Sequence, residues 1–240
     1  MEEKSWLVIV GGTRRLGLAL AKLLAKKHNL VLTSSKLRQT GQGEDELSAL
    51  SICSEVRHFL WDAFDPKLLV KIMTDIGTLR GEGAAIHGAV IAAGAFPLAP
   101  VGSWDSNSLM QTWQLNLSFP LLVVQSLAPH LENGSCIHML LDACIHRPFL
   151  KRLPYSAAKS GMASMVGGLA RALAPKIRVV GHAIGTLLPD EGSNIEFLKG
   201  QSLLNCLGKP EDLCKAIEFA ASSDYLTGEI ITLDGGWRWA

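Results

Sequence analysis

Short apolar runs alternate with amphipathic stretches along the whole chain. Several of these runs are continuous rather than alternating, and the first, "WLVIV", contains no polar residue, which is typical of strands buried on both faces of a parallel sheet. Strands are predicted at residues 6–10, 30–34, 56–61, 86–92, 135–141, 177–184 and 229–233. Helices are predicted at 15–27, about 65–77, about 105–130, about 154–174 and about 210–222. This alternation predicts an α/β fold with a doubly wound parallel sheet, as a single domain over residues 1–240.

Composition restricts the class of partner. The chain has 240 residues, 48% of them hydrophobic and 19% charged, as in a globular protein. A formal net charge of +1 gives no electrostatic reason to expect nucleic acid or an anionic membrane. No apolar run approaches the roughly 18 residues of a membrane span, and "MEEKSWLVIVGG" lacks a signal-peptide pattern. The five cysteines form no CxxC pair, so we expect reduced thiols, and together with the missing signal-peptide pattern this predicts a cytoplasmic location.

A glycine-rich turn, "GGTRRLG", follows the first predicted strand and leads into a helix. Gly11, Gly12 and Gly17 let the backbone approach a phosphate, and the helix start supplies free N–H groups. Arg14 and Arg15 oppose the helix dipole there, which favours an anion bound between them. The alternative is a tight β–α turn that binds nothing.

The second predicted strand ends in "TSSKLRQ". Folds that bind NAD usually carry an acid here for the ribose 2′-hydroxyl, and this chain has none. Ser34, Ser35, Lys36 and Arg38 suit a 2′-phosphate instead, so the sequence favours NADP (NADPH). The alternative is a solvated basic loop.

Further motifs appear in a fixed order after successive strands. They are "WDAFD" with Asp62, "AAG" at 92–94, Asn116 in the long helix, "YSAAK" with Tyr155 and Lys159, and "LTGEIITLDGG". Together with the glycine-rich turn they resemble the short-chain dehydrogenase/reductase family over nearly the whole chain. The resemblance implies a Rossmann-type fold, a small-molecule partner and a set of residues that contact the cofactor. This set is Gly11, Arg14, Arg15, Leu16, Gly17, Ser34, Ser35, Lys36, Asp62, Ala63, Ala92, Ala93, Gly94, Tyr155, Lys159 and Gly185.

Tyr155 and Lys159 are four residues apart and share one face of a helix. A free tyrosine has a pKa of about 10, and a nearby lysine ammonium lowers that value toward the range useful for proton transfer. The resemblance assigns Lys159 to the nicotinamide ribose and Asn116 to a water molecule and the lysine. The alternative is a purely structural Tyr/Lys pair.

Asp142 stands thirteen residues before Tyr155, where most of the family carries serine. Within the family, this acid resembles the pteridine reductases and the dihydromonapterin (dihydrofolate) reductases of short-chain type. Arg15 before Leu-Gly and Phe96 in "AAGAF" resemble the same group. A carboxyl group beside a tyrosine can relay protons, and an aromatic ring can stack on a flat pterin. The resemblance therefore implies substrate contacts by Arg15, Phe96, Asp142, Tyr155 and Leu188.

Other interpretations of these residues stay open. Asp142 can be a capping acid at a strand end, and Phe96 an ordinary apolar loop residue. The motif after the fourth strand has Ile91 where the family usually has asparagine, and Ile184 replaces a proline before Gly185. His138, His146 and His182 lack metal-ligand spacing, so no metal is expected. Segment 186–207 is expected to be the substrate lid.

The sequence predicts reduction of a pterin or dihydropterin to the tetrahydro form, with Asp142, Tyr155, Lys159 and Asn116 as catalytic residues. One alternative is reduction of another carbonyl, such as a 3-oxoacyl thioester, with Asp142 a drifted serine. Another is a dinucleotide sensor without catalysis. The family resemblance also implies a homodimer or homotetramer formed by the helices at 105–130 and 154–174.

Overall fold

The computed structural model describes residues 4–35 and 49–240. Within these residues a seven-stranded sheet has the order β3-β2-β1-β4-β5-β6-β7, and every neighbouring pair is parallel. The strands are β1 Trp6–Val10, β2 Asn29–Ser34, β3 Val56–Leu60, β4 Ile86–Ile91, β5 Ser135–Asp142, β6 Ile177–Ile184 and β7 Ile230–Leu233. Each predicted strand is confirmed to within one residue at either end. The α/β fold with a doubly wound parallel sheet is therefore confirmed.

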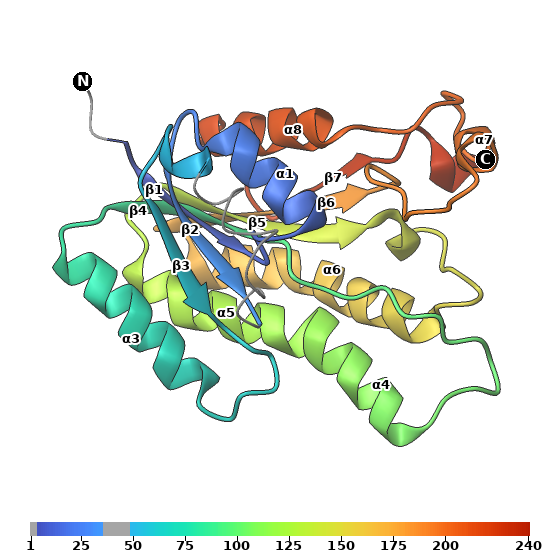
Figure 1. The fold of residues 1–240 in the computed structure, drawn as a ribbon, viewed down its shortest axis with the longest axis horizontal. Coiled ribbons are helices and arrows are strands. Elements are labelled where there is room, and N and C mark those ends of the chain that lie inside the picture. The colour runs from blue at the N-terminus through green and yellow to red at the C-terminus, as the bar shows by residue number, and fades with distance from the viewer. Residues whose placement is uncertain (1–3, 36–48) are drawn as a thin grey trace.

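Helices cover both faces of the sheet (Figure 1). One layer holds α1 Arg15–Leu24 and α8 Pro210–Ser222, and the other holds α3 Leu68–Gly81, α5 Phe119–Leu127 and α6 Leu153–Leu173. α4 Ser106–Trp113 precedes α5, and the short α7 Ile195–Gly200 precedes α8. In residues 4–35 and 49–240, no helix has both the length and the apolar character that crossing a membrane requires.

The uninterrupted apolar run of β1 has a direct structural cause. Val8 and Val10 belong to the core beneath α3, α5 and α6, whereas Leu7 and Ile9 belong to the core beneath α1 and α8. Alternate residues of a strand point to opposite faces, so a strand between two helical layers is apolar at every position. Packing on both faces of the sheet therefore fixes the positions of the central strands, and with them the positions of their carboxyl ends.

The helix predicted at about 65–77 begins later, at Leu68. Two aspartates use the preceding residues for turns: Asp62 Oδ1 accepts from the N–H of Phe64 at 3.0 Å, and Asp65 Oδ1 accepts from the N–H of Lys67 at 2.8 Å. Aspartate side chains that bond to nearby backbone favour turns over helix interiors. The shift of the helix therefore follows from local capping.

The helix predicted at about 105–130 is not a uniform α-helix. A π-helical turn, η1 Gln114–Ser118, separates α4 from α5, and a 3₁₀ turn at Ala128–His130 forms the end of this helical segment. Pro120 has no N–H to donate to the carbonyl of Asn116, and the N–H of Phe119 bonds instead to Gln114, five residues back. The wide turn places Asn116 among buried residues.

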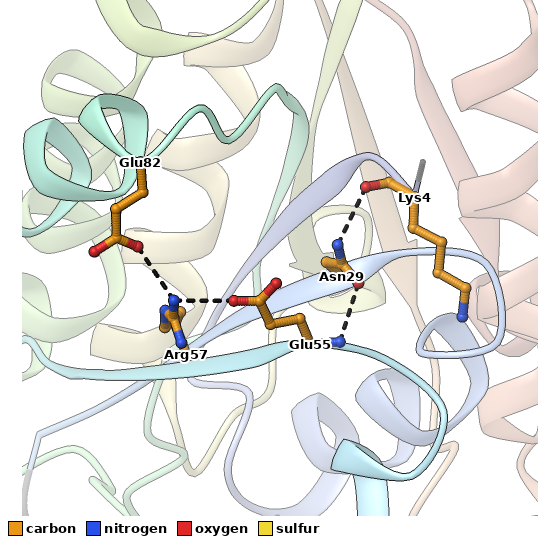
Figure 2. A network of polar contacts seen from close by, with 5 residues as sticks. All are labelled: Lys4, Asn29, Glu55, Arg57 and Glu82. Atoms are coloured by element: carbon orange, nitrogen blue, oxygen red, sulfur yellow. Dashed lines mark hydrogen bonds and ion pairs between the residues drawn. The ribbon is translucent and has the colours of Figure 1, made fainter. Parts of the chain in front are cut away.

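Polar residues connect the amino ends of β1, β2 and β3 (Figure 2). Asn29 donates to the carbonyl of Lys4 at 3.2 Å and accepts from the N–H of Glu55 at 3.0 Å. Arg57 lies between Glu55 and Glu82, at 2.9 and 3.2 Å. Such partly exposed ion pairs contribute little stability individually. They lie at the amino ends of the strands, opposite the edge where a doubly wound sheet binds ligands.

Candidate active site

The turn after β1 is closely packed against the start of α1. Gly11 has φ +80° and donates to Thr33 Oγ1 at 3.2 Å. A Cβ on Gly17 would lie 2.1 Å from the carbonyl oxygen of Gly11, so no larger residue fits there. Among the described residues, no side chain caps the first N–H groups of α1 at Arg14, and its first turn contains no acid. Free N–H groups on a glycine turn fit the diphosphate of a dinucleotide.

Arg15 begins α1 with a left-handed backbone, at φ +47°. Its Nη2 donates to the carbonyl of Leu188 at 3.1 Å and lies 2.8 Å from Asp190 Oδ1. The structure thus brings together Arg15 and Leu188, two expected substrate contacts. Asp190 is an additional member of this cluster that the sequence motifs did not indicate.

The expected adenosine end lies beyond β2 and β3. Ser34 Oγ is 2.9 Å from His58 Nε2, and Ser35 is exposed. The carbonyl of buried Ala63, next to Asp62, accepts from Gln114 Nε2 at 2.8 Å. Lys36 and Arg38 lie outside the described residues, so their expected contact with a 2′-phosphate stays a prediction.

The end of β4 lies directly beside the turn after β1. The N–H of Ala92 donates to the carbonyl of Val10 at 3.0 Å, and a Cβ on Gly11 would lie 3.0 Å from Ala93 Cα. This is the point where the strand order reverses, the usual place for a dinucleotide in such sheets. Gly185 follows β6, where a Cβ would lie 2.9 Å from Asp234 Cα.

The four expected catalytic residues come from distant segments and lie together. Asp142 ends β5, and its Oδ2 accepts from the hydroxyl of Tyr155 at 2.9 Å. The N–H of Cys144 donates to Asp142 Oδ1 at 2.8 Å, which fixes the carboxylate. One turn further along α6, buried Lys159 donates from Nζ to the carbonyl of Leu140 at 2.9 Å.

Asn116 joins this group from η1. Its Oδ1 accepts from the N–H of Ala95 at 3.1 Å, and its Nδ2 donates to the carbonyl of Thr112 at 3.0 Å. A Cβ on Gly94 would lie 2.8 Å from Asn116 Oδ1 and 3.8 Å from Lys159 Nζ. The glycine therefore leaves room for the asparagine and lysine to approach one another.

The protonation of Tyr155 differs from the sequence expectation. Burial raises its pKa well above the ordinary value, and the charge of Asp142 raises it further. Burial also lowers the pKa of Lys159, against the influence of Asp142. Lys159 Nζ lies 5.9 Å from the centre of the tyrosine ring and bonds to the backbone. The expectation that Lys159 lowers the pKa of Tyr155 is therefore wrong for this structure, in which Tyr155 keeps its proton.

Phe96 lies next to Tyr155, with ring centres 4.8 Å apart and planes at 74°. Phe149 contacts its other side at 5.5 Å, and Trp237 near the C-terminal end contacts Phe149 at 5.2 Å. The guanidinium of Arg152 lies 3.7 Å from the centre of the Phe96 ring. Sequence reasoning missed Phe149, Arg152 and Trp237. The only signal for the first two was a mixture of basic and aromatic residues in "HRPFLKRLPY" before the catalytic helix.

His138, His146 and His182 each lie close to another polar side chain. His138 and His182 are buried together in the sheet, with Nδ1 and Nε2 3.1 Å apart, and His146 Nε2 is 3.2 Å from Thr232 Oγ1. Across residues 4–35 and 49–240, no three His, Cys, Asp or Glu side chains are grouped as metal ligands. Each of these three histidines therefore has a side-chain hydrogen-bond partner.

Comparison with known proteins identifies relatives over the full length. Dihydromonapterin reductase of Enterobacter sp. (strain 638) is 26% identical over 239 residues, which cover 96% of this chain and 95% of that protein. Tropinone reductase-like 3 of Erythroxylum coca is 25% identical over 240 residues, covering 95% of this chain and 91% of that protein. These two relatives are about equally similar to the chain.

Solved structures share the fold. A short-chain dehydrogenase/reductase from Serratia marcescens has a TM-score of 0.87 at 23% identity, with 98% of both chains covered. A blue fluorescent protein from a metagenomic library, in complex with NADPH, has a TM-score of 0.84 at 21% identity, with 97% of both chains covered. The family model of the short chain dehydrogenases matches residues 5–196. The chain therefore belongs to the short-chain dehydrogenase/reductase family of oxidoreductases.

Proposed function

We propose that this protein is an NADPH-dependent reductase that converts a pterin or dihydropterin to its tetrahydro form. The observation that carries the proposal is the hydrogen bond from Tyr155 to Asp142, because most of the family has serine in place of this acid. Overall identity does not choose a substrate, since a dihydromonapterin reductase and a tropinone reductase-like protein are about equally similar. The Asp142–Tyr155 pair, with the Phe96 ring against Tyr155, supports the pterin.

The residues present fit a dinucleotide. The glycine turn packs so closely on the start of α1 that a Cβ on Gly17 would lie 2.1 Å from the carbonyl oxygen of Gly11, and the start of α1 offers uncapped N–H groups, within the described residues. When bound, the reduced nicotinamide supplies a hydride to the substrate. Gly11 and Gly17 would hold the diphosphate, Arg14 the 2′-phosphate, and Lys159 the nicotinamide ribose.

The proton in this mechanism comes from the chain itself. An ordinary tyrosine is already protonated at neutral pH, and burial and the carboxylate of Asp142 raise the pKa of Tyr155 further, so its hydroxyl carries the proton that the acid must give. Asp142 orients that hydroxyl through Oδ2, and the N–H of Cys144 holds the carboxylate through Oδ1. After Tyr155 has protonated a ring nitrogen, its phenolate needs a proton from solvent; the carboxylate of Asp142 can accept that proton and pass it to the phenolate oxygen across the same contact. Serine at this position cannot supply an ionisable proton.

The experiment is a steady-state assay of NADPH oxidation with dihydrobiopterin, dihydromonapterin and a 3-oxoacyl thioester. We expect turnover with a dihydropterin and at most weak turnover with the thioester. Turnover with the thioester alone would replace the proposal by the other reductase. NADPH binding without oxidation by any of the three would support the dinucleotide sensor.

The preference for NADPH over NADH has its own support. The end of β2 carries Ser34 and Ser35 with no acid among the described residues there, and Arg14 is exposed at the start of α1. Arg14→Ala should weaken NADPH binding about tenfold and leave NADH binding unchanged, as for loss of a charge-assisted contact with a phosphate. Lys26→Ala, an exposed cation beyond the end of α1, is the matched control. Equal loss for both dinucleotides would contradict a 2′-phosphate site at Arg14.

A homodimer or homotetramer is the proposed assembly. α4 exposes Met110 and Trp113, and α6 exposes Met165, which supports contacts between copies through these helices. Light scattering coupled to gel filtration would measure the mass, and a monomer at micromolar concentration would contradict this. The cytoplasmic location stays a prediction.

A further inference from the structure

The planar guanidinium group of Arg152 lies over the ring of Phe96. The guanidinium carbon of Arg152 lies 3.7 Å from the centre of the ring, and its Nη1 donates to the carbonyl of Phe96 itself. Phe96 is nevertheless 43% exposed, so its ring remains accessible at the site. Arg152 is the N-cap of α6, three residues before Tyr155. A flat, nitrogen-rich group of the protein thus covers the ring that stands next to the catalytic hydroxyl.

A carboxylate from the segment after β6 faces this group. Asp190 Oδ1 is 2.8 Å from Arg15 Nη2, and both side chains are more than half exposed. Burial lowers the pKa of Arg152, and the charge of Asp190 opposes that shift, as does Tyr155. Asp190 therefore interacts with two guanidinium groups, one from the turn after β1 and one from the start of the catalytic helix.

The two guanidinium groups share their chemistry with one end of a pterin. The 2-amino-4-oxopyrimidine ring of a pterin contains a cyclic guanidine, which is planar and presents neighbouring N–H donors along one edge. Its face can stack on an aromatic ring. Its edge can donate two parallel hydrogen bonds to a carboxylate, the arrangement that arginine also forms. Phe96 offers the aromatic face and Asp190 offers the carboxylate. In this structure Arg152 occupies the face of Phe96, and Arg15 contacts the carboxylate of Asp190.

We propose that the aminopyrimidine end of the substrate replaces the Arg152 guanidinium on Phe96 and is bound by the carboxylate of Asp190. Asp190 is then a residue that determines specificity, and Arg152 is a displaceable occupant of the substrate site. The inference rests on the proposed pterin reduction and extends it to the recognition of the 2-amino group. It also explains why an acid lies beside an arginine expected to meet anionic phosphates.

The first test compares a dihydropterin with its 2-oxo analogue, which lacks the amino donor. The wild type should prefer the 2-amino compound, and Asp190→Asn should raise KM for it about ten- to hundredfold and remove the preference. A general effect on the segment or on Arg15 would change KM for both compounds equally. Glu191→Gln, which neutralises the neighbouring acid, is the matched control and should behave as the wild type.

The second test removes the occupant. Arg152→Met should lower KM for the dihydropterin about two- to fivefold, because an exposed cation–π contact no longer competes with the substrate. Arg147→Met is the matched control, since Arg147 lies over the Trp237 ring at 5.3 Å and not over Phe96. A higher KM in Arg152→Met would show that the guanidinium helps to bind the substrate, and would overturn its role as an occupant.

The two proposals fail in different ways. A wild type that reduces no pterin would overturn the proposed function. A wild type that reduces dihydropterins, together with Asp190→Asn that keeps the preference for the 2-amino compound, would overturn only the role of Asp190. Circular dichroism and thermal unfolding would verify that each variant is folded, as expected for substitutions at the surface.

Discussion

The hydroxyl of Tyr155 donates a hydrogen bond to Asp142 Oδ2 across 2.9 Å, and the two residues come from adjoining elements, α6 and the end of β5. The contact joins the group that is expected to give up a proton to one that can replace it. Burial raises the pKa of this phenol and the charge of Asp142 raises it further, so Tyr155 stays protonated well above neutral pH. The consequences of the contact can be measured separately for turnover and for pH dependence.

Tyr155→Phe should reduce turnover by about 10²- to 10⁴-fold while NADPH still binds, because only the acid is removed. Steady-state kinetics and a fluorescence titration with NADPH would measure the two quantities. The chain has one other tyrosine, Tyr225, which is fully exposed, and Tyr225→Phe is the matched control. Undiminished turnover in Tyr155→Phe would disprove the assignment of the acid.

The pH dependence of kcat/KM should depend on Asp142. Because burial and this carboxylate raise the pKa of Tyr155 well above its ordinary value of about 10, the wild type should not lose activity below about pH 10. Asp142→Asn removes the negative charge, lowers the pKa of the tyrosine and moves the alkaline decline to lower pH. Profiles between about pH 7 and 10.5 would test this. An alkaline decline at the same pH in both proteins would show that the carboxylate does not control the phenol.

Gly17→Ala should abolish NADPH binding, since the new methyl group would lie 2.1 Å from the carbonyl oxygen of Gly11 and force the turn apart. A titration with NADPH and a thermal unfolding curve would separate lost binding from lost folding. Gly77→Ala in α3 is the matched control: its methyl group meets nothing within 4 Å, and alanine stabilises a helix interior by about 1 kcal/mol. Normal binding by Gly17→Ala would show that the turn does not hold the diphosphate.

Stability should fall in mild acid because of the buried His138–His182 pair. Burial lowers the pKa of His182 to about 4 and that of His138 well below its usual value. Both imidazoles take up protons only on unfolding, so their contribution is complete above about pH 6.5 and is lost as the pH falls toward the folded values. The free energy of unfolding should drop by about 1.4 kcal/mol per pH unit for each group in that window.

Urea unfolding between about pH 4.5 and 7.5 would measure this slope. His182→Leu should reduce the slope by about one proton, whereas His87→Leu, at an exposed histidine, should keep the slope of the wild type. Equal slopes in all three proteins would mean that the buried pair does not titrate on unfolding.

The sheet, and the grouping of Tyr155 with Lys159, could be predicted from sequence because each leaves a local pattern. A strand such as β1, covered on both faces, must be apolar throughout, and Tyr155 and Lys159 lie on one helix at a fixed spacing. The raised pKa of Tyr155 could not be predicted, since it depends on burial and on which side chain contacts the hydroxyl. The same holds for Asp190, which reaches Arg15 from the segment after β6. Contacts of this kind join residues far apart in the chain and leave no periodic signal.

The π turn at 114–118 sets the direction in which Asn116 points. It holds one residue more than an α-helical turn, and a single residue of an α-helix corresponds to a rotation of about 100°. Deleting one residue from this turn would restore a continuous α-helix and rotate α4 relative to α5 by about that angle. Asn116 could then no longer accept from Ala95 while α5 keeps its place in the core. One residue of helical register therefore decides whether this helix brings Asn116 to the candidate site or only supports the fold.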